Sequence, residues 1–281
     1  MKSRELDARS PAWAETTAAR RETGGVAGFL RQSLALAEMQ LRKLRHDPTE
    51  MLTRIIQPVL WLGVFGEVFT RVRAIPTGQL PYLDFMAPGV LAQSVLFIAI
   101  FYGIAAIWER DLGIIHKLLV SPAPRVALVL GKALSAGVRA LPQACMVYLL
   151  AWLLGVKIKW QPGALAGVAV AVLLGAAAFS TLSLIAACIV KTRERFMGIG
   201  QALTMPLFFA SNAVYPISIM PGWLKALARV NPLTYEVDAM RALMVEGGHS
   251  LYGIGLDFLV LAAATLALTG MASRLYPNLA H

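Results

Sequence analysis

Polar side chains inside otherwise apolar stretches are the first candidates for chemistry in this sequence. They are Glu67, Gln93, Arg139, Gln201, Asn212 and Asp257. Ionisable groups at membrane depth are costly and often mark a pathway. The ionisable three lie within about two turns of the ends of their stretches, so they could instead extend to the membrane surface. The amides are cheaper to bury and more often hold helices together.

Three apolar positions could complete a cargo pathway, although contact with lipid or helix packing explains them equally well. We therefore treat six residues as pathway candidates: Glu67, Gln93, Gln201, Met205, Phe208 and Phe209. Methionine and aromatic side chains suit an adaptable apolar cavity.

Motifs for catalysis and for nucleotide binding are missing. A phosphate-binding loop needs Gly-x4-Gly-Lys-Ser/Thr, but Gly131-Lys132 has Val126 at the first glycine position and Ala133 after the lysine. The four histidines lie far apart, and neither His-Glu-x-x-His nor Gly-x-Ser-x-Gly occurs. The sequence therefore predicts no catalytic residue, no metal site and no cofactor in this chain.

The composition indicates an integral membrane protein. Of 281 residues, 57% are hydrophobic and 15% are charged, and the mean hydropathy is +0.63. A soluble chain of this size has too little interior for so much apolar surface. The net charge of +10 fits cationic loops facing a cytoplasm better than a nucleic-acid partner. Cys145 and Cys188 fall in apolar runs, as small buried hydrophobes do.

Six apolar stretches are predicted to cross the membrane, for which a helix needs roughly 20 residues. They are 55–70, 85–108, 134–156, 163–190, 196–220 and 251–275. Twelve Lys and Arg residues lie near the span ends on the N-terminal side of the membrane, against seven on the other. Positive charge is retained on the cytoplasmic side, so both termini are predicted to be cytoplasmic.

The N-terminal part divides into a flexible cytoplasmic tail, 1–25, and an amphipathic helix, 26–46. In that helix an apolar stripe recurs at spacings of four and three residues, at Leu30, Leu34, Ala37, Leu41 and Leu44. Such a helix is expected to lie along the membrane face, with a coiled-coil seam as the alternative. The remaining residues, 47–281, form the membrane domain.

The loop between the second and third spans, 109–122, predicts a short cytosolic helix with one apolar face. Its candidate site residues are Glu109, Arg110, Asp111, Leu112, Gly113, Ile115, His116, Leu118, Leu119, Ser121 and Pro122. Apolar side chains on a cytosolic loop need a surface that buries them. This helix either packs on its own protein or docks into the groove of a partner.

The segment 211–250, after the fifth span, contains too many prolines for one straight helix. A helix broken at Pro216 leaves carbonyls unpaired at membrane depth, so the segment is predicted to re-enter the outer leaflet. Pro221 and Trp223 favour a short interfacial helix up to Val230. The candidate residues of this outer gate are Asn212, Tyr215, Pro216, Pro221, Trp223, Asn231, Pro232 and Arg241.

The motifs of these two segments, together with six spans over residues 30–275, resemble the type-2 ABC transporter permeases that export drugs, lipids and polysaccharides. The resemblance implies that 109–122 is a coupling helix docked on a cytosolic ATPase, where Mg-ATP is bound. It also implies two permeases and two ATPases in a bacterial inner membrane, with cargo passing between the permeases. Ile114 and His116 depart from the family pattern, where Thr and Glu are common.

Two other functions compete with that of an exporter permease. A proton-coupled secondary transporter would use Glu67 and Asp257, but such transporters are built from internal repeats, and no repeat is evident. A structural membrane anchor would not explain an apolar cytosolic helix. The resulting prediction is an all-α, six-span exporter permease, most simply a homodimer in contact with membrane lipid. The apolar spans favour a lipophilic drug or a lipid over a glycan as cargo.

Overall fold

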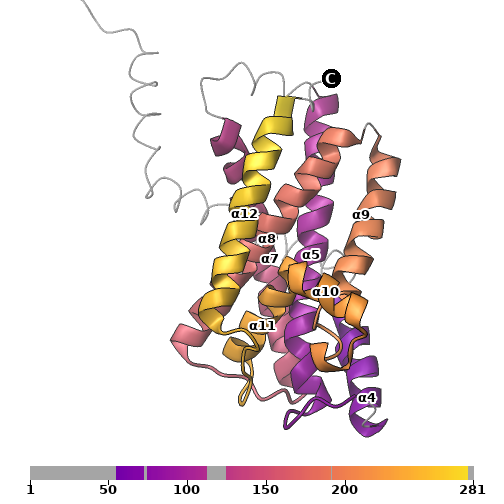
Figure 1. The fold of residues 1–281 in the computed structure, drawn as a ribbon, viewed down its shortest axis with the longest axis vertical. Coiled ribbons are helices and arrows are strands. Elements are labelled where there is room, and N and C mark those ends of the chain that lie inside the picture. The colour runs from indigo at the N-terminus through magenta and orange to yellow at the C-terminus, as the bar shows by residue number, and fades with distance from the viewer. Residues whose placement is uncertain (1–54, 73–74, 113–124, 191, 278–281) are drawn as a thin grey trace, which may run out of the picture.

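The computed structural model describes residues 55–72, 75–112, 125–190 and 192–277, and these fold into a helical bundle (Figure 1). The elements are η2 (Leu60–Gly66, a π-helix), α4 (Glu67–Val72), α5 (Tyr82–Asp111), α7 (Arg125–Leu153), α8 (Pro162–Ile189), α9 (Arg193–Phe209), η3 (Ile217–Ile219), α10 (Gly222–Val230), α11 (Pro232–Met244) and α12 (Ile254–Leu275). The predicted tail, 1–25, the amphipathic helix, 26–46, and residues 113–122 of the coupling helix lie outside the described residues.

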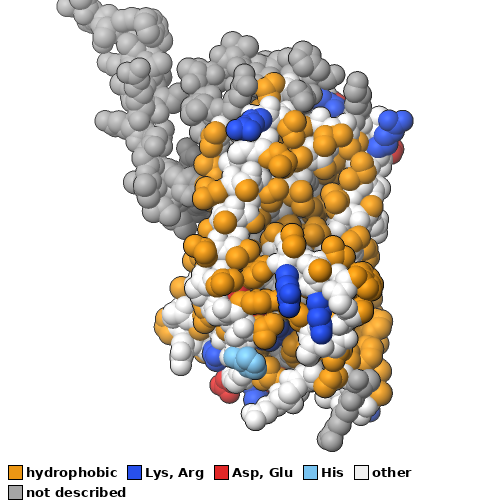
Figure 2. Space-filling model, viewed as in Figure 1, with side chains coloured by type: hydrophobic (Ala, Val, Ile, Leu, Met, Phe, Trp, Pro, Cys, Tyr) orange, Lys and Arg blue, Asp and Glu red, His pale blue; other side chains and the backbone are white. Residues whose placement is uncertain are grey.

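Five helices in the described part are long and apolar enough to cross a membrane. They are Ile55–Val72, Tyr82–Asp111, Leu128–Leu153, Pro162–Ile189 and Ile254–Leu275. Hydrophobic side chains cover most of the face shown in Figure 2, as expected for a lipid-facing surface. The prediction of an all-helical membrane protein is thus confirmed at the level of five apolar helices.

The predicted fifth span, 196–220, is not one continuous helix. The helix α9 ends at Phe209, after 17 residues, and contains Pro206. Beyond it the Ser211 hydroxyl donates to the Phe208 carbonyl at 2.7 Å. This hydroxyl replaces the backbone N–H that would bond to the carbonyl if the helix continued. The chain then turns through Pro216 into η3 and α10. The break expected at Pro216 therefore comes earlier, because the helix has already ended at Phe209.

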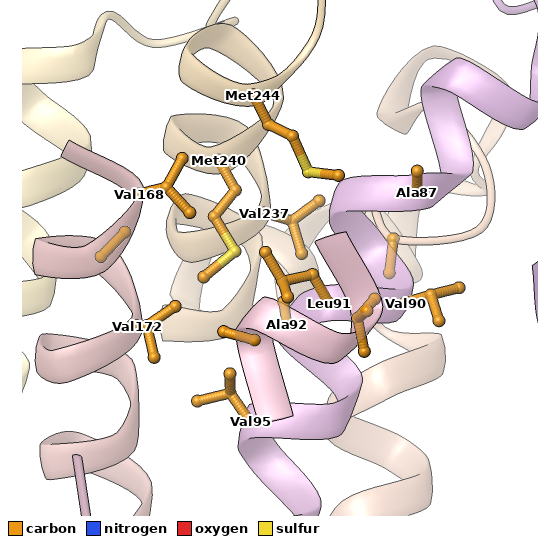
Figure 3. Packing of buried hydrophobic residues seen from close by; sticks show 14 of the residues in the cluster. Ala87, Val90, Leu91, Ala92, Val95, Val168, Val172, Val237, Met240 and Met244 are labelled. Atoms are coloured by element: carbon orange, nitrogen blue, oxygen red, sulfur yellow. The ribbon is translucent and has the colours of Figure 1, made fainter. Parts of the chain in front are cut away.

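The centre of the bundle is α8, which packs against α5, α7, α11 and α12. Figure 3 shows Val168 and Val172 of α8 near Val237 and Met240 of α11, with Leu91 of α5 beside them. Small residues along α8, mostly alanine and glycine, allow these close approaches. In lipid, such close packing contributes more to helix association than apolar burial does.

The two ends of the bundle differ in structure. At one end, the "Asp111 end", α5 and α8 finish and α9 begins; this end is uppermost in Figure 1. The opposite half holds α10 and α11 and the connections from α4 to α5, from α7 to α8 and from α11 to α12. There Ile158 and Val245 form an antiparallel bridge. Two backbone hydrogen bonds flank it, from the Lys159 N–H to the Met244 carbonyl and from the Glu246 N–H to the Lys157 carbonyl, both at 2.8 Å. We call this half the "Asn212 end".

Candidate functional site

At the Asn212 end, the guanidinium of Arg241 joins three segments. The residue is 5% exposed. Its Nη2 donates to the Asn212 carbonyl at 2.7 Å, and its Nε donates to the Phe85 carbonyl at 3.3 Å. Its guanidinium carbon lies 3.9 Å from the centroid of the Phe85 ring. One side chain of α11 therefore fixes both α5 and the segment that follows α9.

The carboxylate of Asp238 holds a further set of backbone groups. Its Oδ1 is 3.6 Å from Nη1 of Arg241 and accepts from the Asn212 amide at 3.2 Å. Its Oδ2 accepts from the backbone N–H groups of Leu251 at 2.6 Å and Tyr252 at 3.3 Å. Asp238 is absent from the residues selected by sequence. The three-residue spacing to Arg241, on one helical face, is the signal that could have found it.

Asn231 connects the end of α9 to the start of α11. Its Oδ1 accepts from the Leu233 N–H at 3.0 Å, and Pro232 occupies the first helical turn, where no N–H is needed. Its Nδ2 donates to the carbonyls of Leu207, at 2.7 Å, and Ala210, at 3.0 Å. The side chain thus satisfies carbonyls that the early end of α9 leaves free.

The other predicted gate residues shape the chain between α9 and α11. The Tyr215 hydroxyl donates to the Phe209 carbonyl. Pro216 precedes η3, and Pro221 precedes α10. Trp223 is 68% exposed on α10, which is the short helix expected up to Val230.

Gly89 allows the segment at Ala213 to lie directly on α5. A Cβ atom at position 89 would stand 2.3 Å from the Ala213 carbonyl oxygen, which is an impossible contact with backbone. The Tyr82 hydroxyl reaches the next carbonyl, that of Val214, at 3.0 Å. The backbone at Ala213 and Val214 therefore packs directly against α5.

At the Asp111 end, charged pairs tie α5 to its neighbours. Glu109 forms an ion pair with Lys132 of α7. Asp111 pairs with Arg193, the first residue of α9, at 2.7 Å. The Arg193 guanidinium also lies 3.9 Å from the centroid of the Trp108 ring.

Of the eleven predicted coupling residues, four are described. Glu109 and Asp111 take part in these contacts, and Arg110 pairs with Asp111 at 3.2 Å and donates to the Val190 carbonyl at 3.4 Å. Leu112 is 69% exposed. The other seven, from Gly113 to Pro122, fall outside the part of the chain that the structure describes.

The pathway candidates do not form one site. Glu67 has a half-exposed side chain and pairs with Arg71 one turn later, at 3.0 Å. Phe208 is buried, and its ring lies 5.4 Å from that of Trp61. Gln93 is buried in α5, whereas the remaining three lie on the surface: Gln201, Met205 and Phe209.

Two further acids are buried, one on α11 and one on α12. Asp257 is fully buried and contacts Ser250 at 2.7 Å. Glu236 is also fully buried, lies against Gly175 of α8, and has no hydrogen-bond partner among the described residues. Nothing in the sequence around Glu236 distinguishes it from an exposed helical glutamate.

Comparison with known proteins assigns a family to this arrangement. The model of the ABC-2 type transporter family matches residues 31–245. The chain is 27% identical over 237 residues to the daunorubicin resistance ABC transporter permease protein DrrB1 of Streptomyces coeruleorubidus, covering 83% of this chain and 82% of that one. It is also 27% identical over 217 residues to the putative transport permease ycf38 of Cyanophora paradoxa, covering 76% and 74%. The inner membrane transport permease YadH of Escherichia coli is 22% identical over 217 residues, covering 74% and 82%.

Proposed function

The chain belongs to the ABC-2 type transporter family, and from this premise we propose that it is the membrane-spanning permease of an exporter driven by a separate cytosolic ATPase. Two permeases and two ATPases form the complete transporter, and cargo leaves the cell between the permeases. The cargo is a lipophilic drug or a lipid. The apolar spans support this, as does the likeness to a permease named for daunorubicin resistance.

The cross-helix contacts at the Asp111 end are the observation that carries this proposal. Residues 113–122 of the coupling segment follow α5 in the chain. The last residues of α5 pair with α7 and α9, and Arg110 donates to the carbonyl of Val190, just after α8. Movement of the ATPase against this segment is therefore passed to four helices together. Leu112 provides an exposed apolar side chain where the docking surface starts.

The remainder of the proposal concerns topology. We assign the Asp111 end to the cytoplasm of a bacterial cell and the Asn212 end to the outer leaflet. The helix α9 serves as the fifth of six crossings, although it has 17 residues, and the 211–250 segment re-enters from outside. The contacts of Arg241 and Asn231 support this, because they satisfy carbonyls that would otherwise be unpaired in lipid.

Labelling of single cysteines tests this topology. Cysteines replacing Lys159 or Lys225 should react with a membrane-impermeant reagent added to intact cells, and a cysteine at Lys191 should react only after the cytoplasm is opened. The background for all three has Cys145 and Cys188 replaced by alanine. The reverse labelling pattern would invert the topology and remove the coupling segment from the cytoplasm.

Reconstitution with the ATPase tests the function itself. The permease alone should neither bind nor hydrolyse ATP, because it lacks a phosphate-binding loop. Together with its ATPase in lipid vesicles, it should show hydrolysis that rises when a lipophilic cargo is added. Saturable nucleotide binding by the isolated permease would contradict the proposal. So would a rate of ATP hydrolysis that no lipophilic drug or lipid changes.

A further inference from the structure

Two buried acids at the Asn212 end share one hydroxyl group. The Oγ atom of Ser250 lies 3.1 Å from Oδ2 of Asp238, on α11, and 2.7 Å from Oδ2 of Asp257, in the first turn of α12. The two acids are 1% and 0% exposed. The same Oγ accepts a hydrogen bond from the Gly253 N–H at 2.6 Å.

A count of protons shows that this arrangement is incomplete when both acids are ionised. A serine hydroxyl carries one proton and two lone pairs. One lone pair receives the Gly253 N–H, and the proton can reach only one carboxylate. The other carboxylate would then face the second lone pair with no hydrogen between the two oxygens. One further proton completes the set, with every contact becoming a hydrogen bond.

The surroundings of the two acids show which of them carries that proton. Asp238 accepts hydrogen bonds from Asn212, Leu251 and Tyr252 and lies beside the Arg241 guanidinium, all of which stabilise an anion. In the described part of the chain, Asp257 has no cation beside it and its Oδ1 has no hydrogen-bond partner. A buried anion without such partners is costly, so the proton belongs on Asp257.

We propose that Asp257 is a proton-binding residue that fastens the start of α12 to α11. Its carboxyl donates to Ser250, and the Ser250 hydroxyl donates to the Asp238 carboxylate. When the carboxyl releases its proton to water, two anions face one hydroxyl and the contact between α11 and α12 weakens. The proposal depends on neither the cargo nor the ATPase, and it gives Asp257 a role in which no proton crosses the membrane.

The test is the apparent unfolding temperature of the purified full-length permease and its variants at a single pH near 7. Asp257→Asn should unfold within about 1 °C of the original protein, because its amide donates to Ser250 as the neutral carboxyl does. Asp257→Leu cannot donate, so it should unfold at a temperature lower by roughly 3 °C. Asp238→Asn should also unfold at a lower temperature, because an amide cannot accept on both sides as this carboxylate does.

One further variant tests the shared hydroxyl. Ser250→Ala should lower the unfolding temperature of the original protein and of Asp257→Asn alike. The proposal is overturned if Asp257→Asn is as unstable as Asp257→Leu, or if Asp238→Asn is as stable as the original protein. Should Asp257→Asn fail to fold, an Asp257→Leu variant as stable as the original protein overturns it as well.

Discussion

Replacing Leu118 or Leu119 by aspartate should weaken association with the ATPase by more than about a hundredfold. Burying one leucine in a docking groove contributes about 1.5–3 kcal/mol, and a desolvated carboxylate in its place costs more. A loss of roughly 3 kcal/mol corresponds to this factor in the dissociation constant. Copurification of the ATPase and export of cargo should therefore fall together.

The permease itself should remain intact in these variants. The spans do not enter the docking groove, so membrane insertion and dimer formation should match the original protein. Leu118→Met conserves the apolar volume and is the matched control, with full association expected. Aspartate variants that retain both association and export would show that this helix packs on its own protein.

Removing the charge of Arg241 should be the most damaging single change at the Asn212 end. Arg241→Gln leaves the buried carboxylate of Asp238 without its cation and frees the carbonyls of Phe85 and Asn212. Breaking such a buried pair costs about 3–5 kcal/mol. For a chain of this size the unfolding temperature should fall by roughly 10 °C.

An arginine nearby provides the control for this experiment. Arg229 is exposed on α10, so Arg229→Gln should change stability by less than about 0.5 kcal/mol. Arg241→Lys should recover only part of the loss, since an ammonium group cannot reproduce the planar fork that bonds two carbonyls. Equal unfolding temperatures for Arg241→Gln and Arg229→Gln would show that the network contributes little to folding.

Apolar runs predicted the long helices well and their charged ends poorly. The stretch 163–190 matches α8 within one residue, because Pro162 starts the helix and the interior carries no charge. The third stretch was placed at 134–156, whereas α7 begins at Arg125. Lys132 breaks the apolar run but is paired with Glu109 on α5, so the helix continues through it. Such a partner is visible only after folding.

The candidate site was predicted in part for a similar reason. Asn212 and Arg241 were selected, and the structure joins them through a 2.7 Å hydrogen bond. The sequence does not predict Asp238, which contacts both, or Ser250, which contacts Asp238. An aspartate on a short helix and a serine in a loop resemble surface residues. Glu67 was selected as an intramembrane charge, yet it pairs with Arg71 on an exposed surface. Sequence gives the identity of a charged group, whereas its burial depends on the neighbouring helices.

The shortness of α9 has a consequence for the bilayer around this protein. Seventeen residues rise about 25 Å, roughly 5 Å less than the hydrocarbon thickness of a typical membrane. Each ångström of such mismatch costs a fraction of a kcal/mol, so with α9 crossing the membrane as proposed, the lipid beside it would be drawn thinner or be replaced by protein. A lipophilic molecule leaving along this helix would therefore cross less hydrocarbon than one leaving elsewhere. Lipids with longer acyl chains would lengthen that route, which would make membrane thickness itself a determinant of transport.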